Sequence, residues 1–263
     1  MANQAEGSEK SDLVAALQQT FLFKECDRPW LLQHLLPESL MAEKLYSNRP
    51  VFTAFRPGAS LNFLYVVVAG GPVITRSAPL DRVIALTYPG SCFGMRNLTV
   101  GCGPVMRAFP SLVEAYKTTD VIKVPVAAVQ ALYENSEPLR QRYRLLFELR
   151  EKFQYHLLNC STYPPQAVAA LLRSLIYQER SLSNQPQPDG LYRFDLPVDL
   201  IARACQLNHR TVEQVLKGML KVGLLQPPDE AETAGDWVVI ADPEGLKEVY
   251  GATRDKVSWW PLR

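Results

Sequence analysis

The pattern of apolar and polar positions changes twice along the 263-residue chain, which predicts a helical start, a β-rich middle and a helical remainder. Residues 12–22 and 28–36 have the spacing of two short helices. Between Pro50 and Pro125, short segments rich in Val, Ile, Phe and Tyr alternate with turns that contain Gly and Pro. Strands this short and this regularly spaced predict an antiparallel barrel or roll.

Helical spacing returns at residues 126–158, where Pro138 fits the first turn of a long helix because its missing N–H would have no partner there. Five apolar residues recur every three or four positions, as in a coiled coil, although Arg150 interrupts the repeat. We predict that they form the seam of a homodimer. The alternative is that this helix packs on its own domain. The predicted seam residues are Leu139, Tyr143, Leu146, Phe153 and Leu157.

Residues 196–226 predict two short amphipathic helices joined by a tight turn. Residues 224–226 and 237–243 predict two strands around a polar loop, which would form a hairpin wing behind the helix pair. The second helix carries hydrogen-bond donors that suit base edges and phosphates, and a polar residue before it can cap the helix. The predicted DNA-binding residues are Asn208, His209, Arg210, Thr211, Gln214 and Lys217.

Composition and charge fit a soluble protein, with 47% hydrophobic and 21% charged residues and a net charge of +1. The basic character is local, because residues 203–221 carry four Lys or Arg side chains against Glu213 alone. Such a stripe is enough for phosphate contact, but its affinity is modest unless two copies act together. No apolar stretch is long enough for a membrane span, and the polar first residues do not resemble a secretory signal.

The five scattered cysteines predict a reducing, cytoplasmic location. We predict no metal site, because there is no C-x-x-C pair and the three histidines are far apart in sequence. We also predict no catalytic residues and no enzyme, since the chain lacks a P-loop, a G-x-G-x-x-G motif and a recognisable Ser-His-Asp or Cys-His arrangement. A redox pair of Cys92 and Cys102 is the remaining enzymatic alternative.

Over roughly residues 15–250 the sequence resembles the CRP/FNR superfamily of bacterial transcription factors. Residues 55–70, 85–94 and 208–225 carry the resemblance together with the long helix. The resemblance implies an α+β fold and a homodimer that reads an inverted DNA repeat with its second helix in the major groove. The expected parts are an N-terminal extension at 1–27, a cyclic-nucleotide-binding-type β-roll at 28–134, a dimerisation helix at 135–160 and a winged helix-turn-helix domain with a C-terminal tail at 161–263.

The predicted recognition helix, residues 208–221, departs from common family sequences. Family members often carry Arg where this chain has His209 and Gln214, and often Glu or Val where it has Arg210. We therefore expect a preferred half-site that differs from the familiar ones.

The sensory pocket also departs from the family pattern. Cyclic-nucleotide binders have F-G-E at this place, whereas this chain has Phe93, Gly94 and Met95. The thioether of Met95 does not replace the carboxylate that accepts hydrogen bonds from the ribose hydroxyl. The phosphate-binding Arg of the family aligns with Phe109, so standard cyclic-AMP binding is not expected.

The same region is similar to the pocket of the 2-oxoglutarate-sensing nitrogen regulator of cyanobacteria. That similarity implies an anion site made by Arg96, Arg107 and Arg144, because guanidinium groups pair bidentately with carboxylate or phosphate. The effector is unknown, and 2-oxoglutarate or a cyclic dinucleotide would suit such a site. The alternatives are three solvated surface arginines, a roll without ligand, or control by another protein.

The expected partners are double-stranded DNA, a second copy of the chain, and RNA polymerase or a regulatory protein, with no membrane. Activation is one expectation, and the sequence does not separate an activator from a repressor. A ligand-binding or scaffold protein that has lost DNA binding is the alternative, in which Arg210, Gln214 and Lys217 would be dispensable. In the C-terminal tail, Trp259 and Trp260 either dock on the body or anchor a partner.

Overall fold

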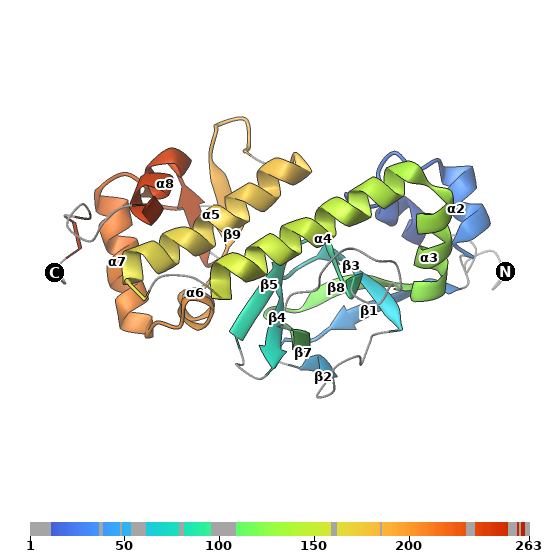
Figure 1. Ribbon diagram of the computed structural model, residues 1–263, viewed down its shortest axis with the longest axis horizontal. Helices are drawn as coiled ribbons and strands as arrows, with labels where there is room; N and C mark the ends of the chain where they lie inside the picture. Colours follow the sequence, from blue (N-terminus) through green and yellow to red (C-terminus); the bar gives the residue numbers. More distant parts are fainter. Residues whose placement is uncertain are drawn as a thin grey trace. The chain divides into compact units, whose positions relative to one another are not determined.

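A computed structural model describes residues 12–36, 39–47, 49–53, 62–78, 82–95, 109–158, 162–184, 186–229, 235–251, 257 and 259–260 (Figure 1). The chain divides into two compact units. The N-terminal unit comprises Met1–Asp81 and Ala85–Glu151, and the C-terminal unit comprises Arg82–Ile84 and Lys152–Arg263.

The N-terminal unit begins with two short helical segments, as the apolar spacing predicted. Residues 12–18 are helical. Helix α2 (Arg28–His34) follows Asp27, whose carboxylate accepts a hydrogen bond from the backbone N–H of Trp30 at 3.2 Å. This contact satisfies one of the free donors at the start of the helix.

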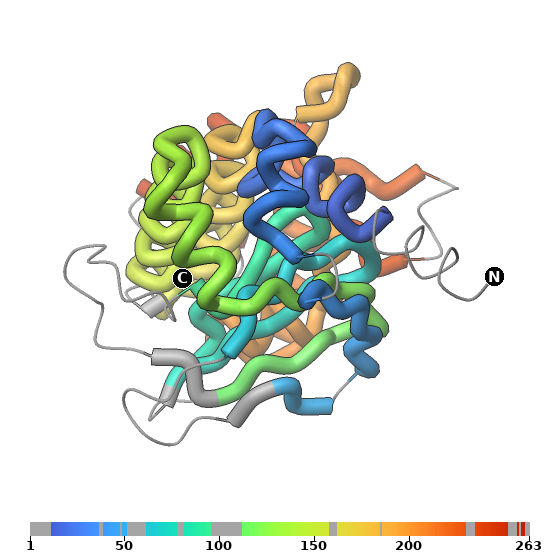
Figure 2. The backbone as a smooth tube through the Cα atoms, turned by 90° about the vertical axis from the view of Figure 1, so that its right-hand side faces the viewer, coloured from blue at the N-terminus to red at the C-terminus, as the bar shows by residue number. Residues whose placement is uncertain are grey.

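The strands of the middle region form two four-stranded sheets, with the orders β1-β8-β3-β6 and β2-β7-β4-β5 (Figures 1 and 2). Neighbouring strands pair antiparallel, for example β3 with β8 and β4 with β7. The predicted roll is confirmed. Its strands are β1 (Met41–Leu45), β2 (Pro50–Thr53), β3 (Phe63–Ala69), β4 (Val73–Ala78), β5 (Arg82–Thr87), β6 (Cys92–Phe93), β7 (Phe109–Ala115) and β8 (Thr119–Pro125).

Strands β1 and β6 had no counterpart in the sequence pattern. The first four residues of β1 are exposed, so their sequence has no apolar alternation, and the strand exists because its backbone pairs with β8. Strand β6 has only two residues, which pair with Tyr65 and Val66 of β3.

The core of the roll is built by side chains from both sheets. This arrangement is expected where the inner faces of two sheets pack together. The buried cluster consists of Leu45, Tyr65, Val67, Val73, Phe93, Val113, Ala115 and Val121.

Two helices follow the roll, α3 (Val126–Asn135) and α4 (Glu137–Leu158), and Pro138 occupies the second position of α4 as its sequence predicted. All five predicted seam residues of α4 are at most 5% exposed in the single chain, which favours the alternative that this helix packs on its own chain. The dimer seam itself stays a prediction. The residues concerned are Leu139, Tyr143, Leu146, Phe153 and Leu157.

Arg150, which interrupts the apolar repeat of α4, has a structural role inside the single chain. Its guanidinium donates to the carbonyl of Cys92 at 2.5 Å and to the hydroxyl of Thr87 at 3.3 Å. The apparent break in a coiled-coil pattern is therefore a polar anchor between α4 and the roll.

The C-terminal unit contains the predicted helix pair and wing. The wing strands β10 and β11 pair antiparallel, and β9 completes a sheet of the order β10-β11-β9. Strand β9 and helix α8 were not predicted. The elements are α5 (Pro164–Leu182), β9 (Tyr192–Asp195), α6 (Val198–Cys205), α7 (His209–Lys221), β10 (Leu225–Gln226), β11 (Trp237–Ile240) and α8 (Pro243–Gly251). None of the described helices combines the length and apolar character that a membrane crossing requires.

Candidate nucleic-acid interface

Helices α6 and α7 are joined by a tight turn at residues 206–208. Gln206 adopts a left-handed conformation with φ of +55°, and the N–H of Leu207 donates to the carbonyl of Ala202 at 2.9 Å. This closure ends α6 and redirects the chain, as in helix ends that finish on a left-handed residue.

The start of α7 is capped by Asn208, as predicted. Its side-chain oxygen accepts a hydrogen bond from the backbone N–H of Thr211 at 2.8 Å, while the Asn208 backbone is extended. Because its side-chain oxygen makes this hydrogen bond, Asn208 stabilises the first turn of α7.

The two faces of α7 have opposite chemistry. Val212, Val215 and Met219 are fully buried on the inner face. The outer face is exposed, and Thr211 lies half-buried at its edge. The structure therefore brings the predicted donors together on one surface. The exposed members are Asn208, His209, Arg210, Gln214 and Lys217.

The charges on this surface are mostly positive. The imidazole Nδ1 of His209 lies 3.7 Å from a carboxylate oxygen of Glu213, one helical turn later, so this acid is directed to the start of the helix. Within the described residues, Arg210 and Lys217 form no ion pair, and both side chains are exposed. Exposed cations on a helix that projects several donors can contact phosphates and base edges.

The sheet beside α7 carries a cationic residue, Arg193, that the sequence pattern did not indicate, because its strand β9 was not predicted. Arg193 of β9 donates to Asp189 at 2.6 Å and lies 4.0 Å from Asp229, so its charge is neutralised within the unit. Trp237 at the start of β11 is 36% exposed. Arg210 and Lys217 of α7 are therefore better placed than Arg193 to contact a polyanion.

The predicted sensory pocket has its apolar members in the core of the roll. Phe93 is 1% exposed and stacks on Tyr65, with ring centroids 4.7 Å apart. Gly94 has a φ of +92°, which favours glycine, and Met95 is buried. The carbonyl of Met95 accepts a hydrogen bond from the hydroxyl of Tyr143 on α4.

The predicted arginine cluster is only partly within the described residues. Arg144 is exposed on α4, and its Nε donates to the hydroxyl of Tyr133 at 3.0 Å. Arg96 and Arg107 lie outside the described residues, as does Cys102 of the proposed redox pair. The anion site therefore stays a prediction. Cys92 is fully buried, and burial raises the pKa of its thiol to about 11.

Solved structures similar to this chain include FixK2 from Bradyrhizobium japonicum and a CooA variant from Carboxydothermus hydrogenoformans. FixK2 is 16% identical, with a TM-score of 0.57 over 81% of this chain and 98% of FixK2. The CooA variant is also 16% identical, with a TM-score of 0.55 over 81% of this chain and 88% of that chain. No protein-family model and no curated protein sequence matches the chain.

These likenesses establish the fold. The chain shares the fold of these two proteins, with an N-terminal β-roll and a C-terminal unit of helices and a small sheet. The predicted α+β fold class is confirmed.

Proposed function

We propose that the protein is a sequence-specific DNA-binding transcription regulator of the CRP/FNR type. The observation that carries this proposal is the outer face of α7, where Arg210, Gln214 and Lys217 are exposed opposite a fully buried apolar face. A helix presented in this way fits the major groove, where Arg, Gln and Asn side chains distinguish base pairs by their hydrogen bonds.

The proposed division of labour on α7 follows from the positions of its side chains. Arg210 and Gln214 lie four residues apart on neighbouring turns and would contact base edges. Lys217 lies near the end of the helix, and its ammonium would contact phosphate as a point charge. Asn208 would hold the first turn in the conformation that presents these groups.

We further propose a homodimer, so that two copies of α7 bind an inverted repeat whose half-sites lie about 34–36 Å apart. Because the predicted seam is buried, a dimer formed along α4 would use the exposed side of this helix. That side carries Gln141, Arg144, Glu148, Lys152 and Tyr155.

An effector that binds the roll would raise DNA affinity only if it binds the DNA-binding conformation more tightly than the other conformation. DNA would then raise the affinity for the effector by the same factor. The exposed guanidinium of Arg144 beside the hydroxyl of Tyr133 supports an anionic effector. The classes to test are cyclic nucleotides, cyclic dinucleotides and 2-oxoglutarate.

The test is in vitro selection of duplex DNA by the purified full chain, followed by a salt titration on the selected sequence. We expect enrichment of an inverted repeat, bound far more tightly than random DNA, with an affinity that falls steeply with salt. Repeating the selection with each candidate effector separates a protein that needs a ligand from one that does not recognise DNA. Absence of enrichment under every condition would reject the proposal.

A further inference from the structure

The sequence left open whether Trp259 and Trp260 dock on the body of the protein or anchor a partner. In the structure, Val257 and Trp260 are buried against the C-terminal unit. Val257 is 3% exposed and Trp260 is 2% exposed. The backbone N–H of Trp260 donates to the carbonyl of Val257 at 3.1 Å, and the rings of Trp259 and Trp260 meet edge to face with centroids 6.4 Å apart. These three residues, called the tail below, form a compact turn.

The ring of Trp259 rests on the backbone of α7 at Gly218. A Cβ atom added to Gly218 would lie 2.4 Å from Cε3 and 2.6 Å from Cζ3 of Trp259, far closer than real Cβ atoms approach other atoms. Glycine is unfavourable inside a helix, because it loses more conformational freedom than alanine. Gly218 is explained by the close approach of the Trp259 ring, which leaves no room for a Cβ atom.

The docking point lies at the edge of the proposed base-reading side of α7, where Gly218 is half-buried. Gly218 follows Gln214 by four residues, so the two positions are neighbours on the same face, about one helical turn apart. Trp259 therefore contacts α7 one turn after Gln214, a side chain that we assign to base contact.

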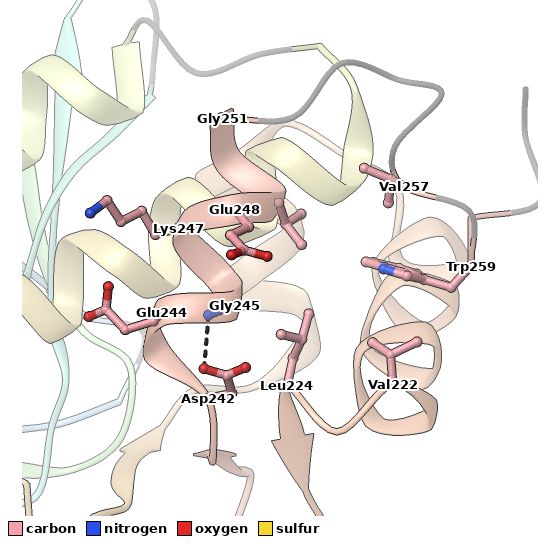
Figure 3. Close-up of a pocket in the computed structure, with 11 residues that line it drawn as sticks. Val222, Leu224, Asp242, Glu244, Gly245, Lys247, Glu248, Gly251, Val257 and Trp259 are labelled. Atoms are coloured by element: carbon pink, nitrogen blue, oxygen red, sulfur yellow. Dashed lines mark hydrogen bonds between the residues drawn. The ribbon is translucent and has the colours of Figure 1, made fainter.

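Trp259 also lines a cavity of about 720 Å³ together with residues of α8. Leu224, Glu248 and Val257 are among the other lining residues. Figure 3 shows Trp259 beside the helix that precedes Val222, on the opposite side of this space from Lys247 and Glu244.

We propose that Trp259 is a positioning residue for DNA recognition, acting through its contact with Gly218. The proposal rests on the proposed function of α7. The flat ring fixes the rotation and tilt of the second half of α7, and with them the placement of Gln214. Hydrogen bonds to base edges are sensitive to small displacements, whereas charge contacts with phosphates are tolerant. Loss of the ring should therefore weaken specific binding more than non-specific binding.

The experiment compares Trp259→Ala, Gly218→Ala and the double variant for binding to the selected sequence and to random DNA. We expect each single variant to bind the selected sequence about tenfold more weakly, which corresponds to about 1.4 kcal/mol. Binding to random DNA should change less than twofold. The double variant should be no weaker than Trp259→Ala, because the space is then empty and alanine favours the helix.

Two further variants serve as controls. Trp259→Phe should restore part of the specific affinity, since it keeps a flat aromatic ring but reaches less far than the six-membered ring of indole, whose atoms lie nearest Gly218. Trp30→Ala removes a tryptophan of the N-terminal unit that packs against His34, and should leave both affinities unchanged. Circular dichroism and thermal unfolding identify any variant that fails to fold.

Docking is measured without DNA by ¹⁹F NMR of the protein labelled with 5-fluorotryptophan, which gives one signal for each of the four tryptophans. The Trp259 signal, assigned by its loss in Trp259→Phe, should shift in Gly218→Ala. Equal losses on selected and random DNA, or losses that multiply in the double variant, would overturn the positioning role. If the wild-type protein selects no sequence, the proposed function and the positioning role both fail, while the ¹⁹F shift still reports whether the ring docks.

Discussion

Helices α4 and α7 both carry apolar side chains at three- and four-residue spacing, but they differ in the chemistry of the opposite face. The outer side of α4 mixes charges, with Arg144 and Lys152 against Glu148. The outer side of α7 gathers Arg210 and Lys217 beside uncharged donors. Periodicity predicts that one face of a helix is buried, whereas the composition of the other face indicates what that helix can bind.

The comparison also separates two uses of an apolar stripe. The stripe of α7 was expected to pack within its own unit, and it does so. The stripe of α4 was expected to meet a second chain, but its own chain buries it. A repeat of apolar residues does not specify which chain supplies the partner, because the hydrophobic effect is non-directional.

The largest effect that tests this comparison is expected for Leu146→Asp. Leu146 is 5% exposed, so the new carboxylate would be buried without a partner, and we expect a loss of about 3–5 kcal/mol in the free energy of unfolding. Urea unfolding measures it, with Gln141→Asp on the exposed side as the matched control. If Leu146→Asp unfolds like the wild type but no longer forms dimers, the original seam prediction is correct after all.

A smaller effect is expected for Arg210→Ala on the outer face of α7. Loss of a bidentate base contact should weaken binding to the selected sequence by about 1–3 kcal/mol and relax the preference at one base pair. Quantitative binding to selected, singly substituted and random DNA measures this change. Lys247→Ala, which removes an exposed cation from α8, is the control. An equal loss on random DNA rejects base reading by Arg210.

The cap of α7 should contribute about 1 kcal/mol to stability, which Asn208→Ala would remove. Asn208→Asp keeps an acceptor for the N–H of Thr211 and should retain most of this contribution. Chemical unfolding of the three proteins measures the difference. Equal destabilisation by both substitutions would show that the hydrogen bond is not what stabilises the start of the helix.

The smallest effect is expected for Lys217→Ala, because it removes a single phosphate contact. Binding should weaken by a similar factor on all sequences, and the slope of log affinity against log salt should decrease by about one. A salt titration on selected and random DNA measures both quantities. A loss confined to the selected sequence would instead assign Lys217 to base contact.

Much of the fold could be predicted from local patterns. Short segments rich in Val, Ile, Phe and Tyr between Gly- and Pro-containing turns identified most strands of the roll, and the position of Asn208 identified the start of α7. Strand β1 was missed because its first four residues are exposed and only pairing with β8 makes them a strand. Strand β9 was missed for a related reason, since its pairing with β11 is a contact between distant parts of the chain.

The sequence by itself determined which residues of α6 and α7 face inward, where α7 begins and which donors remain outside, because these follow from helical spacing and a local cap. Only the tertiary structure decided that the apolar stripe of α4 is buried by its own chain, and that Trp259 docks on Gly218. Both are contacts between segments far apart in the sequence. Such contacts depend on how the elements pack in space, which local periodicity does not encode.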